Sequence, residues 1–447
     1  MQSSQQYIDL FRQSASLIDR HSAPAMNALR AAAFDDFVRL GFPTTKEERY
    51  KYTDVASLFA PDYGLNLGRI DIPVNPYDAF RCDVPNLSTS LFFVVNDVFC
   101  SRFIHKASLP EGVLVGSLCE AAVRYPSLVE RCYGRLASSG EDGITALNTM
   151  LAQDGLLVYV PKGVQVERPV QVVNILRADV DLMVNRRVLI VVEEGAAIKL
   201  LFCDHAADDR RFLTTQVTEA FVGERASLDL YCLEETHAKN TRLSNLYIRQ
   251  EASSHVCHNA ITLMGGTTRN RTDLVFCGEN ASCDMGGCVV ADHTQHVDNN
   301  VLIDHRVGRC SSNVLYKYVL DHEATGAFAG RVLVRPEAQQ TTSVERNQNI
   351  CATRQARMYT QPMLEIYADD VKCSHGSTVG QIDEAALFYM QQRGISRQEA
   401  QLLLKFAFVG EVIDTMKLEP LQDRLHHLVE KRFRGELGRC EGCRLCK

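Results

Sequence analysis

The chain changes its hydrophobic pattern twice along its length. Between Met26 and Leu40, apolar residues recur at steps of three to four positions, which predicts an amphipathic helix that ends at Gly41. A polar and proline-rich stretch then continues to about residue 85. From Gly155 onward, short β-branched runs alternate with Gly, Pro, Asn or charged turns, a pattern typical of consecutive strands with no helix between them.

A weak sequence repeat runs through the predicted strands. Its copies are Glu194–Leu200, Glu224–Leu230, Gln250–Val256 and Glu279–Met285, with a fainter copy from Gly308. The copies start 30, 26, 29 and 29 residues apart, which fits a solenoid in which each copy is a turn followed by a strand. We therefore predict a mainly β protein with a parallel β-helix core. A β-sandwich whose strands share a turn preference is the alternative, but about 220 residues of strand exceed the usual length of a sandwich.

After residue 380 the pattern becomes helical again. Asp383 is positioned to cap a helix that ends near Gly394, and Ser396 with Glu399 forms a capping box for the next helix. That helix is strongly apolar and a further helical pattern follows Pro420, so we expect a hairpin that caps the solenoid, docks a partner, or does both. The chain thus divides into a helical region with a linker (1–85), a β-helix core (86–380), a C-terminal helical region (381–435) and a cysteine-containing tail (436–447).

The bulk composition is that of an ordinary globular protein. Hydrophobic residues make up 46% of the chain and charged residues 23%, so most of it should fold. The net charge of −7 argues against a general affinity for nucleic acid. No apolar run approaches the ~20 residues of a membrane-spanning helix, and the N-terminus has no signal-peptide pattern. The 16 cysteines fit a compartment in which thiols stay reduced. We therefore expect a cytoplasmic protein with no nucleic-acid or membrane partner.

Four segments carry the most specific information in the sequence. The longest is LEIYADDVKCSHGSTVG at residues 364–380; the others are GRVLVRPEAQ at residues 330–339, FYMQQRGI at residues 388–395 and PTTKEERYKYT at residues 43–53. Together they resemble the SufB/SufD family, and in particular its SufD branch. A 17-residue match with matching flanks is far more specific than a short motif. One position departs from the family pattern, because Tyr50 stands where the family has tryptophan, which still leaves an aromatic side chain there.

The resemblance implies a fold, a function and a set of partners. The family fold is a right-handed parallel β-helix between helical terminal regions, in agreement with the strand pattern. SufD-type chains are scaffold subunits of a SufBCD-type complex, not enzymes: they pair with a SufB-like homologue, bind a SufC-like ATPase through their C-terminal helices and receive sulfur from a cysteine desulfurase system. The resemblance also implies a transient iron–sulfur cluster, or iron, at the interface with the SufB-like partner, where Cys373 and His375 match the family's cysteine and histidine. A homodimer is the alternative for the chain in isolation.

The chemistry of Cys373 and His375 agrees with that role. Residues two apart in a strand face the same side of a sheet, so a thiolate and an imidazole would be presented together. Iron accepts sulfur and nitrogen ligands, and two ligands from one chain leave the others to sulfide or a second protein. Asp369 and Asp370 are candidates to orient the imidazole or to bind iron through oxygen. Charged residues at a solvated strand edge are the plain alternative for both.

The C-terminal tail carries a second candidate metal site. Cys440, Cys443 and Cys446 follow a Cys-x-x-Cys-x-x-Cys spacing. Three thiolates at that spacing can bind a cubane cluster or a zinc ion when a fourth ligand comes from elsewhere. A frayed terminal segment with reactive thiols is the alternative.

Missing motifs narrow the function further. The chain has no GxxxxGK[ST] phosphate loop, so an ATP requirement belongs to a partner, and it has no GxSxG or HExxH motif. The sequence leaves flavin binding undecided. Two other functions compete with the scaffold role. A β-helix carbohydrate-active enzyme is disfavoured by the absence of Trp, and a small electron carrier built on the tail would need another cysteine between Cys373 and Cys440.

Overall fold

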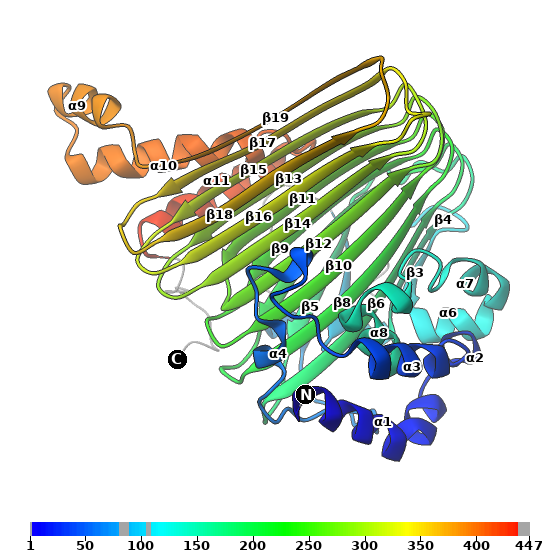
Figure 1. Cartoon of the computed structure of the whole chain (residues 1–447). Helices are drawn as coiled ribbons and strands as arrows, with labels where there is room; N and C mark the ends of the chain where they lie inside the picture. Colours follow the sequence, from blue (N-terminus) through cyan, green and yellow to red (C-terminus); the bar gives the residue numbers. More distant parts are fainter. Residues whose placement is uncertain (1, 80–88, 104–108, 437–447) are drawn as a thin grey trace.

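The centre of the molecule is a β-helix in which the chain passes alternately through two long sheets (Figure 1). The computed structural model describes residues 2–79, 89–103 and 109–436. Helices lie on the outside of the two sheets at the N-terminal and C-terminal sides (Figure 1). This architecture confirms the predicted mainly β fold with a parallel β-helix core and excludes the β-sandwich.

Neighbouring strands are parallel throughout both sheets, except for two antiparallel pairs at the first end. The ten-stranded sheet has the order β19 (Val371–Gly380), β17 (Thr341–Cys351), β15 (Ser311–Leu320), β13 (Ser282–Ala291), β11 (His255–Met264), β9 (Ser227–Glu235), β7 (Ala197–Ala206), β5 (Val170–Leu176), β1 (Ser90–Val95) and β2 (Val98–Phe99). The nine-stranded sheet has the order β18 (Arg357–Ile366), β16 (Thr325–Val334), β14 (His296–His305), β12 (Thr267–Phe276), β10 (Thr241–Gln250), β8 (Phe212–Val222), β6 (Leu182–Val192), β4 (Gly155–Val160) and β3 (Leu114–Ser117). One strand of each sheet makes a coil, so the strands from β4 and β5 to β18 and β19 form eight coils.

The strands stack in register, so each inward-facing side chain lies beside its counterpart in the next coil. Val256 of β11, for example, is paired with Leu228 of β9 and with Cys283 of β13. Such inward-facing rows form the largest core cluster, which extends from Phe92 in β1 to Ala368 before β19. Burial of these apolar rows is the main force that holds the coils together.

A turn with one left-handed residue leads into successive strands of the ten-stranded sheet. These residues have φ between 56° and 65°, and they are Gly195, Arg225, Ser253, Asn280, Arg309 and Gln340. The N–H of Arg225, for instance, donates to the carbonyl of Ala252 in the next coil at 2.8 Å. The turns coincide with the sequence repeat, with one correction. The third copy begins at Ala252 and not at Gln250, because Gln250 ends β10 and Val256 pairs with Leu228 instead of Leu230.

Most of the N-terminal helices cover the outer face of the nine-stranded sheet. The helices are α1 (Gln2–Arg20), α2 (Pro24–Asn27), α3 (Arg30–Leu40), α4 (Val55–Leu58), α5 (Pro76–Ala79), α6 (Leu118–Arg124), α7 (Pro126–Cys132) and α8 (Gly143–Leu151), with short 3-10 turns η1 (Glu48–Tyr50), η2 (Ser101–Phe103) and η3 (Ser139–Glu141). The short α5 is the exception, because its Tyr77 packs on Phe93 of β1 in the ten-stranded sheet. The helix predicted between residues 26 and 40 is present as α2 and α3. Phe37 of α3 and Leu147 of α8 belong to one cluster with Leu213 of β8. The buried guanidinium of Arg30 donates to the carbonyls of Met150 and Ala152 and ties α3 to the end of α8.

The segment at residues 43–53, one of the four that resemble the family, lies across the same sheet. Tyr50 is buried, its hydroxyl bonds the Asp142 carboxylate, and the guanidinium of Arg269 lies 3.9 Å from the centre of its ring. Tyr52 stacks on Tyr359 of β18 with ring centres 4.8 Å apart. An aromatic side chain at residue 50 therefore fills a packed position, which agrees with the Trp-to-Tyr departure noted above.

The C-terminal hairpin covers the outer face of the ten-stranded sheet. It contains α9 (Glu384–Gln392), α10 (Arg397–Ile413) and α11 (Glu419–Phe433), and both predicted N-caps are formed, by Asp383 and Ser396. Side chains of α10 and α11 share a buried cluster with Leu233 and Ile261 of the sheet. Figure 1 shows α9 projecting away from the β-helix. Among the described residues, no helix is long and apolar enough to cross a membrane.

Candidate functional site

Cys373 and His375 lie together on the inner face of β19, the last strand of the β-helix. Val371 and Cys373 border the inward-facing core, and the alternation of a strand directs His375 to the same side. Lys372 and Ser374 face outward. Burial raises the pKa of the Cys373 thiol, an effect that a backbone hydrogen bond at Ser343 partly opposes, whereas His375 is exposed because no coil follows β19. The structure therefore brings the two predicted residues to one face.

A third polar residue, Glu345, lies beside this pair and was not among the predicted site residues. It is paired with His375 across β17 and β19, as Ser343 is with Cys373. Its side chain is only 1% exposed, one carboxylate oxygen has no hydrogen-bond partner, and burial raises its pKa to about 8. The sequence could have identified Glu345, because it lies 30 residues before His375, about one repeat period.

Asp369 and Asp370, the candidates to orient the imidazole or to bind iron, precede β19. Both are exposed in the turn before β19. The backbone of Asp370 stabilises this turn. The N–H of Gln340 donates to its carbonyl, and its own N–H donates to the side chain of Gln339. Five residues of extended strand separate Asp370 from His375 by roughly 16 Å, too far for either carboxylate to hydrogen-bond the imidazole. The structure does not bring these acids to the Cys373 and His375 face.

The candidate ligands of the last coil do not form a complete metal site. Within the part of the chain that the structure describes, three potential ligand atoms lie within 4.8 Å of one another only at Asp292, His293 and His322, on a distant corner. In that group Asp292 is already engaged by Arg432 in a two-pronged ion pair. The tail residues Cys440, Cys443 and Cys446 lie outside the described residues. Any further ligand for Cys373 and His375 must therefore move into place or come from another molecule.

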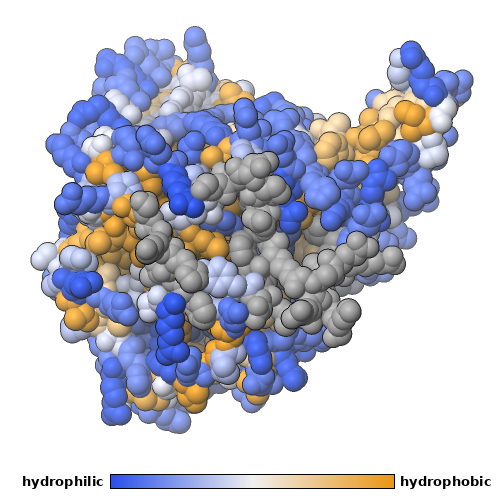
Figure 2. Space-filling view, turned by 180° about the vertical axis from the view of Figure 1, so that it is seen from behind, coloured by the Kyte–Doolittle hydropathy of each residue, from blue (hydrophilic) through white to orange (hydrophobic). Residues whose placement is uncertain are grey.

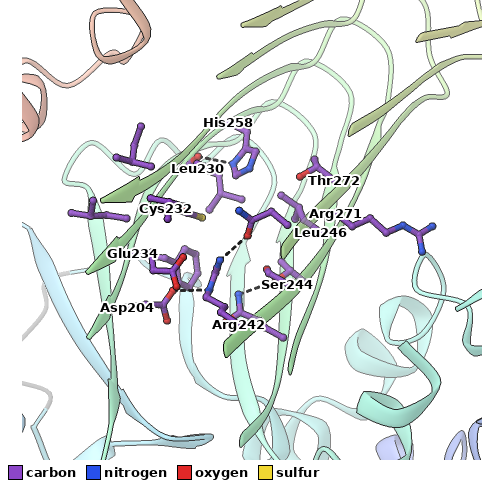
Figure 3. A pocket seen from close by; sticks show the side chains of 18 residues that line it. Asp204, Leu230, Cys232, Glu234, Arg242, Ser244, Leu246, His258, Arg271 and Thr272 are labelled. Carbon is purple, nitrogen blue, oxygen red and sulfur yellow. Dashed lines mark hydrogen bonds and ion pairs between the residues drawn. The ribbon is translucent and has the colours of Figure 1, made fainter. Parts of the chain in front are cut away.

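The middle of the β-helix contains a sealed polar cluster, shown in Figure 3. Asp204 bonds Arg186 at 2.7 Å and lies 3.3 Å from Arg242, which also donates to Asn270 at 2.7 Å. Burial favours the protonated carboxyl of Asp204, but the two guanidinium groups outweigh it and leave its pKa below the usual value. The cluster surrounds a cavity of about 30 Å³, which is room for about one water molecule.

Two further ionisable groups complete this cluster. Glu234 accepts from Thr268, and burial is the main cause that raises its pKa to about 7. The Nδ1 of His258 lies 3.0 Å from the carbonyl of Leu230, and burial lowers the pKa of this histidine to about 4 (Figure 3). Burial therefore disfavours the charged forms of Glu234 and His258, whereas Asp204 is stabilised as a carboxylate by its two arginines.

Comparison with known proteins now assigns the family. Residues 1–172 match the family model described as SufBD protein N-terminal region, and residues 175–408 match the one described as SUF system FeS cluster assembly, SufBD core domain. The chain belongs to the SufBD family. It is 26% identical over 421 residues to an iron–sulfur cluster assembly SufBD family protein of Synechocystis sp., with 90% of each chain covered. It is also similar to the iron–sulfur cluster assembly protein SufD of Escherichia coli, at 26% identity with 89% of this chain and 91% of that one covered. SufD of Bacillus subtilis is 24% identical, with 94% and 97% covered.

Family membership confirms the resemblance seen in the sequence and links this SufBD protein to the SUF system of iron–sulfur cluster assembly. The matched core model, residues 175–408, contains the strands from β6 to β19 and most of α10. Cys373, His375 and Glu345 therefore all lie inside the family's core domain. They lie in the last two coils of the β-helix, on the neighbouring strands β17 and β19.

The last coil of the SufBD protein presents open strand edges. β19 ends one sheet and β18 ends the other, and among the described strands neither has a partner on its outer side. Large apolar side chains are exposed here, namely Ile366 at 40%, Tyr367 at 62% and Val379 at 50%. An unpaired strand edge beside exposed apolar side chains is a ready surface for another chain.

A second apolar surface lies on the projecting C-terminal arm. Phe388 and Tyr389 of α9 are 63% and 60% exposed, and Leu403 of α10 is 38% exposed. In Figure 2 hydrophobic atoms follow the arm that projects at the upper right. The opposite side of α10 is buried against the β-helix, so only one side of this helix is free to meet a partner.

Proposed function

We propose that this SufBD protein is a scaffold subunit of a SufBCD-type complex and not itself an enzyme. It pairs through its last coil with a SufB-like homologue, and Cys373 and His375 hold iron or a transient iron–sulfur cluster between the two chains. A SufC-like ATPase docks on the C-terminal helices, and a cysteine desulfurase system delivers the sulfur. The observation that carries the proposal is the coincidence of an incomplete sulfur and nitrogen ligand pair with the open end of both sheets.

The arrangement explains why a partner is needed. Iron in a cluster takes sulfide and protein ligands, and this face offers one thiol and one imidazole. The open strand edges let a homologous β-helix continue the two sheets, which would enclose the face and exclude water. For the ATPase, the exposed Phe388 and Tyr389 provide an apolar anchor that is independent of the solenoid.

The test is cluster assembly on the complex that carries His375→Ala. The complex would be reconstituted anaerobically with Fe²⁺ and a desulfurase sulfur source, with Cys440, Cys443 and Cys446 changed to Ser so that the tail contributes no thiols. We expect the cluster yield, read by absorbance and Mössbauer spectroscopy, to fall at least tenfold while the complex and its thermal unfolding stay unchanged. The reason is that an exposed imidazole contributes a ligand but little packing.

His293→Ala is the matched control, since His293 is also an exposed histidine but lies on a distant corner. Cys373→Ala distinguishes two forms of the site. A loss as large as that of His375→Ala makes the cysteine a ligand, and a smaller one makes it a neighbour. Normal cluster yield in His375→Ala, or a yield that declines only in step with stability, would reject the proposed site.

A further inference from the structure

Glu345 is a buried carboxylate with no described partner at the open end of the β-helix. Its side chain is 1% exposed and its Oε1 atom is buried without a hydrogen bond. A carboxyl group in this state loses hydration without gaining a partner, so its burial opposes folding. Other buried acids of the interior are arranged differently, as Asp204 shows with its two arginines. An unpaired buried acid beside a proposed metal site is a candidate for a functional group.

The position of Glu345 relative to the predicted pair is set by strand geometry. Adjacent strands are about 4.8 Å apart, so the Cα atoms of Glu345 and His375, which are register partners, are separated by about that distance. Cys373 is two residues from His375, about 6.8 Å along the strand. The three side chains point into the same end of the interior, and a glutamate has enough side-chain torsions to turn its carboxylate toward the neighbouring imidazole.

The opposite wall of the interior leaves space for this carboxylate. Gly330 of β16 faces Glu345, and a Cβ atom at residue 330 would collide with both carboxylate oxygens. The hydroxyl of Thr360 on β18, the strand after β16 in this sheet, is also buried without a hydrogen bond. The last coils therefore contain buried polar groups that the described residues leave without hydrogen bonds, and the acid among them fits only because residue 330 has no side chain.

We infer that Glu345 supplies a carboxylate ligand to iron, so that the inner face of the last two coils is a sulfur, nitrogen and oxygen site for Fe²⁺. This inference rests on the proposed function and adds a residue to its site. Fe²⁺ accepts carboxylate, imidazole and thiolate together, and a charged oxygen ligand is the one the Cys373 and His375 pair lacks. The acid remains buried and unpaired in the free chain because its partner is the metal.

The test measures Fe²⁺ binding and stability separately in the full-length chain with Cys440, Cys443 and Cys446 changed to Ser. Anaerobic equilibrium dialysis would give the Fe²⁺ affinity, and thermal unfolding without metal would give Tm. Glu345→Gln keeps the shape but removes the anionic ligand, so we expect at least a tenfold loss of affinity with a Tm that is unchanged or higher. Glu337→Gln makes the same charge change at an exposed residue near the same end and should change neither quantity.

The outcomes separate the inference from the proposed function. If Glu345→Gln binds Fe²⁺ as tightly as the parent chain while His375→Ala does not, Glu345 is no ligand and the proposed site stands without it. If His375→Ala also binds normally, the proposed site itself is wrong. Glu345→Asp retains a carboxylate on a shorter side chain and should recover part of the affinity. A lower Tm in both Glu345 variants, with affinity falling only in proportion, would make Glu345 a structural residue and overturn the inference.

Discussion

The middle of the β-helix and its last coil contain the same kinds of inward-facing polar residue in different surroundings. In the middle, Asp204 is held by Arg186 and Arg242, and coils lie on both sides of the cluster. In the last two coils, Glu345 of β17 has no described partner for its buried oxygen and His375 of β19 is exposed. The two regions differ in closure, because no coil follows β19 to complete the polar face that Glu345 and His375 share.

This difference shows how a repeat fold can make a binding site without a cleft. Each coil satisfies the polar groups of its neighbour, as when Arg242 reaches Asn270 in the next coil. Where the stack stops, the same inward positions are left with unmet hydrogen bonds and free ligand atoms. A second molecule that continues the stack would complete them. The comparison therefore predicts that changes in the middle alter stability, whereas changes at the end alter binding.

The largest expected effect comes from opening the sealed cluster with Asp204→Ala. Removal of this carboxylate leaves two buried guanidinium groups facing each other without their anion, which should lower the free energy of unfolding by roughly 3–5 kcal/mol. Chemical denaturation would measure it. Asp209→Ala is the control, since Asp209 is an exposed partner of Lys239 and its loss should leave the free energy of unfolding unchanged. If the two variants lowered the free energy of unfolding equally, the middle of the β-helix would not depend on its buried ion pairs.

A somewhat smaller effect is expected on the pH dependence of the free energy of unfolding, which Glu234 and His258 of the same cluster should influence. The pKa of Glu234 rises from 4.5 to about 7 on folding, so its contribution to stability is present below pH 4.5 and is lost as the pH rises to 7. The pKa of His258 falls from 6.5 to about 4, so its contribution is present above pH 6.5 and is lost as the pH falls to 4. Each shift corresponds to roughly 3 kcal/mol, and between pH 4.5 and 6.5 the two oppose each other.

Single variants should separate the two contributions. In Glu234→Gln only the histidine remains, and stability relative to the parent chain should increase by roughly 3 kcal/mol from pH 4.5 to 7. In His258→Gln only the acid remains, and relative stability should decrease over the range from pH 4 to 6.5. Denaturant unfolding at a series of pH values measures both. Parallel pH profiles in all three proteins would show that neither group changes its protonation on folding.

The sequence predicted much of this molecule, and the parts that it missed have physical causes. The repeat identified the β-helix because each coil needs one turn with a left-handed residue, and strand alternation placed Cys373 and His375 on one face. Glu345 was missed because its role depends on the pairing of coils, and the repeat is faint beyond Gly308. Arg186 and Asp204 were missed because charged residues in a strand pattern are usually expected at the surface.

The smallest effect on stability, and the most direct test of the open end, is expected from Val379→Asp on β19. Val379 is already 50% exposed in the free chain, so the charge should change the free energy of unfolding by less than about 0.5 kcal/mol. If a SufB-like homologue continues the sheets at this end, however, the same charge would be buried in the interface. Association with the homologue, measured by sedimentation or titration calorimetry, should then weaken at least tenfold, or about 1.4 kcal/mol.

Val180→Asp places an equal charge at a residue that is 58% exposed in the loop between β5 and β6, and it should leave association unchanged. If both variants bind the homologue as the parent chain does, the last coil is not the interface, and the open end would need another explanation.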